Sequence, residues 1–428
     1  MKKVKWMLSV LTVIGILATV VVGCGDDDEP PALTLVSLTA DGIDLNAATS
    51  ATGVPVGATI VATFNVPVDA ATANSAITLV RDLDDQNFPA AITVVGEEVT
   101  INPNSDFSTG TLFILTFGVG LKSAAGAALT TAIERNFTSE GTFAVPGAIA
   151  HWTFEDDAID IIGNRAPKAS GTVAITYVAG RKAEAGKAAS FDGNTSIIEY
   201  ADGEQLINNG SWAMSVWVKT NSDHLNADDN PAGHFVLGMG AGLGFQFEIF
   251  GSYNAFKLAA SYSHTNPAGA GKFGEDLWAD GEGNLGWQGW VFSKDFTSVG
   301  GMNTVIKDLW AHYVFVYNSA TRQGIVYLNG ERIKEQDFDN WPDDSNPRFA
   351  TGLGYRGGLV GDVNPEVVNE LALGFIRSRT GTLFAGEPWG NYDLPTSNHF
   401  KGLMDDLIFY HKVLTEAEIT AMYNSGKP

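Results

Sequence analysis

The chain is poor in the residues that several classes of protein require. One cysteine among 428 residues excludes a disulfide scaffold and a zinc or iron–sulfur site ligated by cysteines. Lysine and arginine number 26 against 49 aspartates and glutamates, which argues against a nucleic-acid-binding protein, because such proteins need a basic surface. Only 16 prolines stand beside 48 glycines, a balance that fits all-β domains with many turns. The 45 aromatic residues in turn exclude a disordered chain, and the length indicates two or three domains.

The N-terminus has the pattern of a secretory signal peptide over residues 1–23, with three lysines before an uncharged apolar run over 6–22. Residues 21–24 (Val-Val-Gly-Cys) resemble the lipobox of bacterial lipoproteins, which implies that Cys24 carries the lipid. The alternative is an uncleaved anchor. The acidic tether over 24–32 resembles the surface-export signal of Bacteroidota lipoproteins, the alternative being a plain spacer. We therefore expect a lipid-anchored protein on the surface of the cell outer membrane.

Residues 33–140 are predicted to form an antiparallel β-sandwich, because seven short β-rich runs alternate there with turns. Residues 41–69, 99–103 (Val-Thr-Ile-Asn-Pro) and 121–129 resemble the bacterial Ig-like domains of the S-layer type. The resemblance implies a spacer that raises another unit above the membrane. The segment has no histidine, cysteine or tryptophan, so we expect no active site in it.

Residues 147–428 are predicted to form a second all-β unit, a two-sheet jelly roll with a short C-terminal helix. Asn329-Gly330 lies between Ile-Val-Tyr-Leu over 325–328 and Glu-Arg-Ile-Lys over 331–334, and predicts a hairpin with a type I′ turn. Thr415 and Glu418 form the pattern of a capping box, and an apolar stripe follows them, which together predict the helix.

The order of motifs in this second unit resembles the laminin-G-like, concanavalin-A-like jelly roll of bacterial surface proteins. The resemblance does not cover two segments, near 221–305 and near 338–398, which we interpret as insertions. The motifs that carry it lie at 151–155, 160–164, 189–193, 212–219, 310–314, 326–330, 400–407 and 414–419.

The resemblance also implies a structural Ca²⁺ near a sheet edge, since domains of this kind often carry one. Calcium takes six to eight oxygen ligands from carboxylates, amides and carbonyls. The alternative is that Asp192 and Asp405 only cap turns through backbone N–H groups. The candidate ligands in the matching motifs are Glu155, Asp160, Asn164, Asp192, Asp405 and Asp406.

The two insertions have the composition of a carbohydrate-binding surface. Sugars are bound by aromatic faces together with planar polar side chains, and both insertions combine aromatic residues with glycine, aspartate and asparagine. The alternative is that these rings fill the small cores of their own long loops. The candidate carbohydrate-binding residues are Trp278, Trp287, Trp290, Trp341, Tyr355, Trp389 and Tyr392.

Catalysis is not expected. A retaining glycoside hydrolase needs two carboxylates about 5 Å apart, and the jelly-roll hydrolases that this unit resembles take them from a Glu-x-Asp-x-Glu strand. The nearest match, residues 335–339, lacks the last glutamate. The sequence therefore predicts a non-catalytic surface lipoprotein that binds a polysaccharide in support of an outer-membrane uptake or degradation system. The alternatives are an adhesion or structural protein that binds another protein, and a glycoside hydrolase or lyase.

Overall fold

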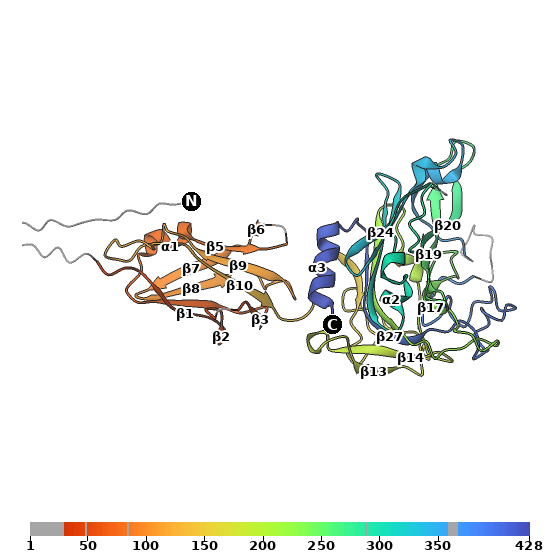
Figure 1. Cartoon of the computed structure of the whole chain (residues 1–428), viewed down its shortest axis with the longest axis horizontal. Coiled ribbons are helices and arrows are strands. Elements are labelled where there is room, and N and C mark those ends of the chain that lie inside the picture. Colours follow the sequence, from red (N-terminus) through yellow and green to blue (C-terminus); the bar gives the residue numbers. More distant parts are fainter. Residues whose placement is uncertain (1–29, 48, 84, 287–288, 358–366) are drawn as a thin grey trace, which may run out of the picture.

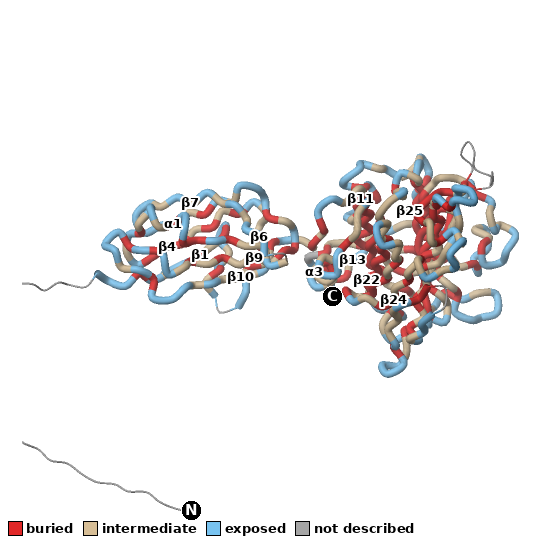
Figure 2. Tube along the Cα trace, turned by 90° about the horizontal axis from the view of Figure 1, so that it is seen from above, coloured by how far each residue is buried: buried red, intermediate tan, exposed pale blue. Residues whose placement is uncertain are grey.

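The computed structural model shows two β-rich units that follow one another along the long axis of the molecule (Figure 1). Buried residues concentrate inside each unit, and the chain narrows between the two (Figure 2). Within the described residues, no helix combines the length and the apolar character that a bilayer crossing requires. The residues described are 30–47, 49–83, 85–286, 289–357 and 367–428.

The smaller, N-terminal unit is a sandwich of two sheets, as its sequence predicts, but one strand pair, Ala51–Val54 with Ile133–Ser139, is parallel and not antiparallel. The first sheet has the order β2 (Ile43–Asp44), β1 (Leu35–Ala40), β4 (Ile60–Phe64), β8 (Glu98–Pro103), β7 (Ala90–Val95). The second has the order β3 (Ala51–Val54), β10 (Ile133–Ser139), β9 (Leu112–Phe117), β5 (Ile77–Arg81), β6 (Gln86–Asn87). In β4 the apolar Ile60, Ala62 and Phe64 are buried while the residues between them are partly exposed. Because side chains alternate along a strand, one face of β4 packs on the core and the other faces outward.

The larger unit consists of two packed sheets, here named the β27 sheet and the β19 sheet. The β27 sheet has the order β13 (Thr176–Ala179), β14 (Lys187–Asp192), β27 (Lys401–Tyr410), β16 (Trp212–Thr220), β22 (Trp310–Asn318), β23 (Gln323–Leu328), β24 (Glu331–Asp337), β21 (Trp290–Ser293), and β11 (Ala148–Trp152) also pairs with β27. The β19 sheet has the order β12 (Thr172–Val173), β15 (Ile197–Tyr200), β26 (Leu371–Leu373), β17 (His234–Met239), β18 (Phe245–Ile249), β19 (Phe256–His264), β20 (Gly271–Ala279), and β25 (Ala350–Leu353) pairs with β19.

Aromatic side chains fill the space between these two sheets. The ring of Phe247 on β18 lies 5.0 Å from that of Tyr313 and 5.2 Å from that of Phe315, both on β22 of the opposite sheet. Trp152 and Trp212 are completely enclosed in the same core. The predicted all-β fold is therefore confirmed for both units.

The local signals of the sequence also appear in the structure. Asn329 and Gly330 have φ angles of 53° and 78° and join β23 to β24, as a type I′ turn requires. The helix α3 (Glu416–Gly426) begins with the predicted capping box, in which the Glu418 N–H donates to Thr415 Oγ1 and the Thr415 N–H donates to Glu418 Oε2.

Two further short helices, α1 (Ala70–Ala76) and α2 (Asn303–Ile306), are not predicted by the sequence pattern. With seven and four residues they are too short to show an apolar period. In α1 the Asp69 carboxylate accepts the backbone N–H of Ala71 and caps the first turn.

Candidate functional site

The outer faces of the two sheets in the larger unit differ in polarity. The outer face of the β27 sheet is apolar at Ala213, Val314 and Ile408, and it is covered by α3 and the connecting segment around Phe143. The β19 sheet lies on the far side of the unit from the N-terminal domain (Figure 1). Since side chains alternate along a strand, the buried aromatic residues of β18 leave the polar Gln246 and Glu248 on this outer face.

Strand register brings these polar residues beside others of β19 and β20. Glu248 is paired with Lys257, and Lys257 is paired with Trp278, so the three form one row across the sheet. A second row runs parallel to it and has a small residue, Ala259, at its centre. The second row consists of Gln246, Ala259 and Asp276.

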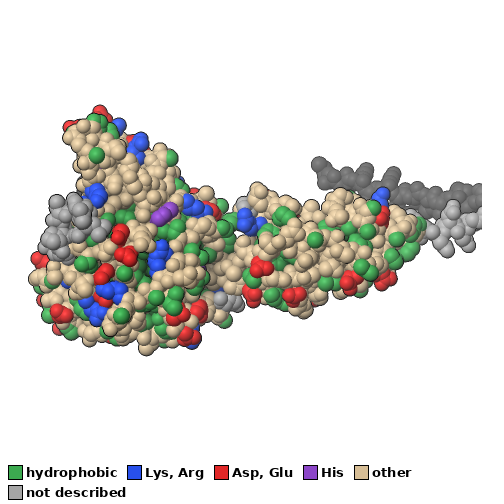
Figure 3. All heavy atoms as spheres, turned by 180° about the vertical axis from the view of Figure 1, so that it is seen from behind, with side chains coloured by type: hydrophobic (Ala, Val, Ile, Leu, Met, Phe, Trp, Pro, Cys, Tyr) green, Lys and Arg blue, Asp and Glu red, His purple; other side chains and the backbone are tan. Residues whose placement is uncertain are grey.

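Lys257 forms ion pairs with a carboxylate in each of the two rows. Its Nζ lies 3.0 Å from Asp276 Oδ2 and 4.0 Å from Glu248 Oε2, and Gln246 Nε2 donates to Glu248 Oε2 at 3.0 Å. Burial raises the pKa of Glu248, while Lys257 and Gln246 act in the opposite direction. Acidic and basic side chains also lie intermixed on the face of the larger unit that Figure 3 shows.

Aromatic rings border the polar rows on two sides. Trp278 packs edge-on against Phe250 with 5.1 Å between ring centroids, and Lys257 Nζ lies 5.7 Å from the centre of the Trp278 ring. Across the face, Phe384 and Trp389 are each 39% exposed, and their rings lie 5.0 Å apart. Large exposed rings beside fixed hydrogen-bonding groups are unusual on a protein surface and indicate a binding site.

These residues enclose two adjoining hollows of about 470 Å³ and 630 Å³. Both hollows share Ala241, Ala259 and Phe384, so together they form one elongated depression, which we call the groove. Ala241 and Phe384 have φ angles of 50° and 61°, in the left-handed region that residues with a Cβ rarely adopt. Backbone strain of this kind is concentrated at functional sites.

One wall of the groove is a long loop that a buried arginine organises. The side chain of Arg377 donates from Nε to the Leu383 carbonyl at 2.7 Å, and from Nη1 and Nη2 to the carbonyls of Gly381 and Gly390. The loop therefore presents Phe384 and Trp389 from a backbone held at several points. We call residues 377–398 the wall loop.

The structure brings two of the predicted carbohydrate-binding residues, Trp278 and Trp389, to the groove. Tyr392 packs on Phe375 and donates its hydroxyl to the Thr195 carbonyl, and it is not among the residues that line the groove. Trp287 lies outside the described residues.

The expectation of exposed rings does not hold for the other three candidates. Trp290 is buried beneath Lys334, whose Nζ lies 3.3 Å from the ring centre. Tyr355 is buried and donates its hydroxyl to the Val367 carbonyl, and Trp341 packs against the main core. These three rings pack against other parts of the protein and do not line the groove.

The groove also contains residues that the sequence reasoning missed. Gln246, Glu248, Lys257 and Asp276 lie in regions interpreted as strands or insertion, and Phe384 lies in the wall loop. The alternation Phe-Gln-Phe-Glu over 245–248 was the available signal, because it puts two polar side chains on one face of a strand.

The six predicted calcium ligands do not converge. Within the described residues no group of three histidine, cysteine, aspartate or glutamate side chains is arranged to hold a metal ion. Asp192 accepts the backbone N–H groups of residues 194–196, which hold its pKa at about 2 despite partial burial, so it caps a turn. Asp160 pairs with Arg165 at 2.6 Å. Asn164 lies at a turn, with a φ of 52°.

Two of the other predicted ligands, Asp405 and Asp406, belong to a buried ion-pair network. Arg181 donates to the carboxylates of both Asp405 and Asp406, and His151 Nε2 lies 2.7 Å from Asp406 Oδ1. Glu155 accepts the Lys187 backbone N–H at 3.0 Å. The carboxylates that were expected to bind calcium thus have partners within the protein, and the donor set does not fit a calcium ion.

Comparison with known proteins places only the first unit in a family. Residues 40–139 match the Bacterial Ig-like domain family, and no curated protein matches the chain. Among solved structures, the binding domain of Paraclostridial Mosquitocidal Protein 1 aligns with a TM-score of 0.39 and 14% identity over 65% of this chain, which spans 52% of that structure.

Two further solved structures align over 65% of the chain. Domain 4 of AbnA, a GH43 extracellular arabinanase from Geobacillus stearothermophilus in complex with arabinotriose, has a TM-score of 0.35 and 20% identity over 98% of that chain. The botulinum neurotoxin serotype D ligand binding domain in complex with N-acetylneuraminic acid has a TM-score of 0.39 and 11% identity over 50% of that chain. The chain thus carries an N-terminal unit that matches the bacterial Ig-like family, followed by a larger β-sandwich with a groove.

Proposed function

We propose that this protein is a non-catalytic, polysaccharide-binding surface lipoprotein, and that the groove of its larger unit is the binding site. The observation that carries the proposal is the combination, in one open depression, of the Trp278 and Trp389 rings with the side chains of Gln246, Glu248 and Lys257. A sugar ring presents apolar C–H faces and a rim of hydroxyl groups, and this groove offers a surface for each.

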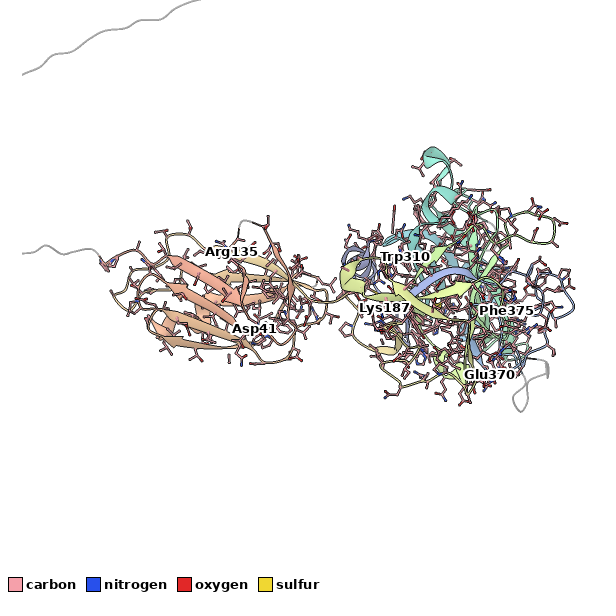
Figure 4. All side chains as sticks on the ribbon, turned by 90° about the horizontal axis from the view of Figure 1, so that it is seen from below. Asp41, Arg135, Lys187, Trp310, Glu370 and Phe375 are labelled. Carbon is pink, nitrogen blue, oxygen red and sulfur yellow. The ribbon has the colours of Figure 1, made fainter. Side chains whose placement is uncertain are left out.

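The position of the groove supports a role in capturing material outside the cell. In Figure 4, Glu370, next to β26 of the β19 sheet, lies far from the N-terminal unit, whereas Lys187 lies near it. A groove on the β19 sheet is therefore directed away from the N-terminal unit. Lipid attachment at Cys24 and an outer-membrane location remain part of the proposal, and they rest on the sequence pattern of residues that the structure does not describe.

The same geometry favours binding over hydrolysis. A glycoside hydrolase needs one carboxylic acid to donate a proton and a second carboxylate to act as nucleophile or base. In the groove, Lys257 lies between Glu248 and Asp276 and opposes the rise in the pKa of Glu248 that burial causes. We therefore propose that these carboxylates accept hydrogen bonds from a bound sugar.

Affinity electrophoresis of the full-length protein in detergent, through gels that contain individual polysaccharides, tests the proposal. Trp389→Ala and Trp278→Ala should each weaken retention by about tenfold, the effect of losing about 1.4 kcal/mol of binding energy. Trp310→Ala is the matched control, since Trp310 is partly exposed on the β27 sheet and is labelled in Figure 4. No retention by any polysaccharide, or equal weakening by all three substitutions, would contradict the proposal and favour a protein ligand.

A further inference from the structure

We infer that the groove is selective for an electrically neutral glycan chain that is long enough to occupy both hollows. This inference rests on the proposed function and deepens it by naming the class of ligand. It follows from two features of the groove: the balance of its charges and the placement of its two tryptophans, Trp278 and Trp389, in different hollows.

The charged side chains that line the groove balance one another. Among the described residues, Glu248 and Asp276 supply two negative charges, and Lys257 and Arg356 supply two positive charges. Lys257 is bound between the two carboxylates, and Arg356 donates from Nε to Ser261 Oγ at 2.7 Å.

A fifth ionisable residue at the groove, Glu275, does not alter this balance on the outer face. Glu275 is paired with Ala260, whose side chain belongs to the core, so it points between the sheets and not outward. There it accepts a hydrogen bond from Gln336 of the opposite sheet at 3.4 Å. The outward-facing charges of the groove therefore sum to about zero.

A balanced row of this kind disfavours charged sugars of either sign. An anionic sugar placed on the row would meet Glu248 and Asp276, and the single positive charge of Lys257 is already shared between those two carboxylates. A cationic sugar would have to displace Lys257 from the same carboxylates. Like charges brought together in a partly buried site repel each other strongly, and the formal net charge of −23 on the chain repels polyanions further.

Neutral hydroxyl groups can both donate hydrogen bonds to the side chains of the row and accept hydrogen bonds from them. A hydroxyl donates one hydrogen bond and accepts others. The carboxylates of Glu248 and Asp276 can accept from it, while Lys257 and Gln246 can donate to it, and these groups alternate across the face. A chain of neutral sugars can therefore pair with the row without separating the ion pairs that hold it.

The two tryptophans indicate that the ligand is a chain. Trp278 lines the first hollow and Trp389 lines the second, and Phe384 stands where the two hollows meet. A single sugar ring can stack on only one of the two tryptophans. Affinity should therefore rise with chain length until both rings are covered, because the second contact is made without a new loss of translational freedom.

The test compares glycans that share a backbone and differ in charge. Polygalacturonate is compared with its fully methyl-esterified form, and chitosan oligosaccharides with the corresponding N-acetylated ones, beside neutral glucan, mannan and arabinan, by affinity electrophoresis of the full chain. We expect retention by neutral members only, with an affinity that changes less than about twofold between low and high salt, where surface charge effects would be screened. A series of neutral oligosaccharides should bind more tightly as it lengthens.

A variant that removes the central cation adds an independent readout. Lys257→Met should lose affinity for the neutral chain about tenfold and gain salt-sensitive retention of chitosan, because Glu248 and Asp276 are then uncompensated. Lys187→Met is the control, since Lys187 is an exposed lysine paired with Asp156 away from the groove. Circular dichroism of both variants checks that they fold.

The outcomes separate the two claims. Retention of only the anionic or only the cationic polymer, lost at high salt, would overturn the inference and leave carbohydrate binding intact. Equal affinity for a monosaccharide and a long oligosaccharide would overturn the extended site. No retention by any glycan would overturn the proposed function itself.

Discussion

The buried ion pairs around Arg181 provide a sharp test of the structure. The guanidinium is 1% exposed, donates to the carboxylates of Asp405 and Asp406, and lies 4.7 Å from the centre of the Trp217 ring. Arg181 Nε also donates to the carbonyl of Gly426 at the end of α3, at 2.7 Å. One side chain thus binds two buried carboxyl groups and fastens the C-terminal helix to the β27 sheet.

Replacing this arginine with methionine keeps most of the apolar volume and removes the charge. Asp405 and Asp406 would remain in the interior without their main counter-charge, and removing one partner of a buried ion pair costs about 3–5 kcal/mol. For a unit of this size that loss lowers the melting temperature by roughly 10 °C. Arg181→Lys should lower the melting temperature by less than Arg181→Met does. Lysine restores the positive charge, but it cannot bind two carboxylates through the paired N–H groups of a guanidinium.

Guanidinium denaturation and calorimetry of the full chain measure the effect, with Lys187→Met as the matched control. Lys187 also pairs with an aspartate, Asp156, but the two side chains are 43% and 68% exposed, so its loss should cost less than about 1 kcal/mol. If Arg181→Met were no more destabilising than Lys187→Met, the two carboxylates would not depend on this arginine and the reasoning would be refuted.

Three further predictions concern single residues. Burial raises the pKa of Glu275 to about 7, so the folded protein binds a proton at this residue more tightly than the unfolded chain does. The free energy of unfolding should therefore fall as pH rises from about 4.5 to 7. Glu275→Gln should flatten that slope in denaturation curves recorded across this range, and an unchanged slope would contradict it. Arg377→Met should release the wall loop, reducing glycan affinity more than melting temperature, and proteolysis should cut between residues 378 and 390. Gly330→Ala should destabilise by more than Gly286→Ala in calorimetry: both have positive φ, but a Cβ at Gly330 would meet Tyr423 of α3 at 2.8 Å, whereas Gly286 faces open space. Equal losses of stability in the two variants would show that α3 can shift away from the new Cβ without destabilising the protein.

The Asp405–Asp406 pair shows how a sequence motif can suggest a role that the structure does not support. The sequence marks two adjacent acids at the end of a conspicuous motif, and calcium was the expected partner. The structure supplies Arg181 instead, a residue 224 positions earlier than Asp405. No local pattern connects these residues, because β13 and β14 bring Arg181 to β27 only through strand pairing.

Much of the fold can be read from local signals. The alternation of β4, the Asn329-Gly330 turn and the capping box of Thr415 and Glu418 each act over a few residues, so the sequence alone specifies them. The first unit is recognisable for the same reason, since its motifs over 41–69 and 99–103 are contiguous. The acidic balance and the single cysteine likewise exclude whole classes of protein through composition alone.

The groove depends on tertiary structure. Gln246, Lys257 and Asp276 become neighbours through the register of three strands, and the wall loop adds Trp389 from more than a hundred residues farther along the chain. Whether a tryptophan in an insertion is exposed, as Trp389 is, or buried, as Trp290 is, depends on which distant side chains pack against it. The sequence by itself determined the strands, the turns and the aromatic composition. Only long-range packing decided which rings and charges meet, because local propensities carry no information about strand register or loop docking.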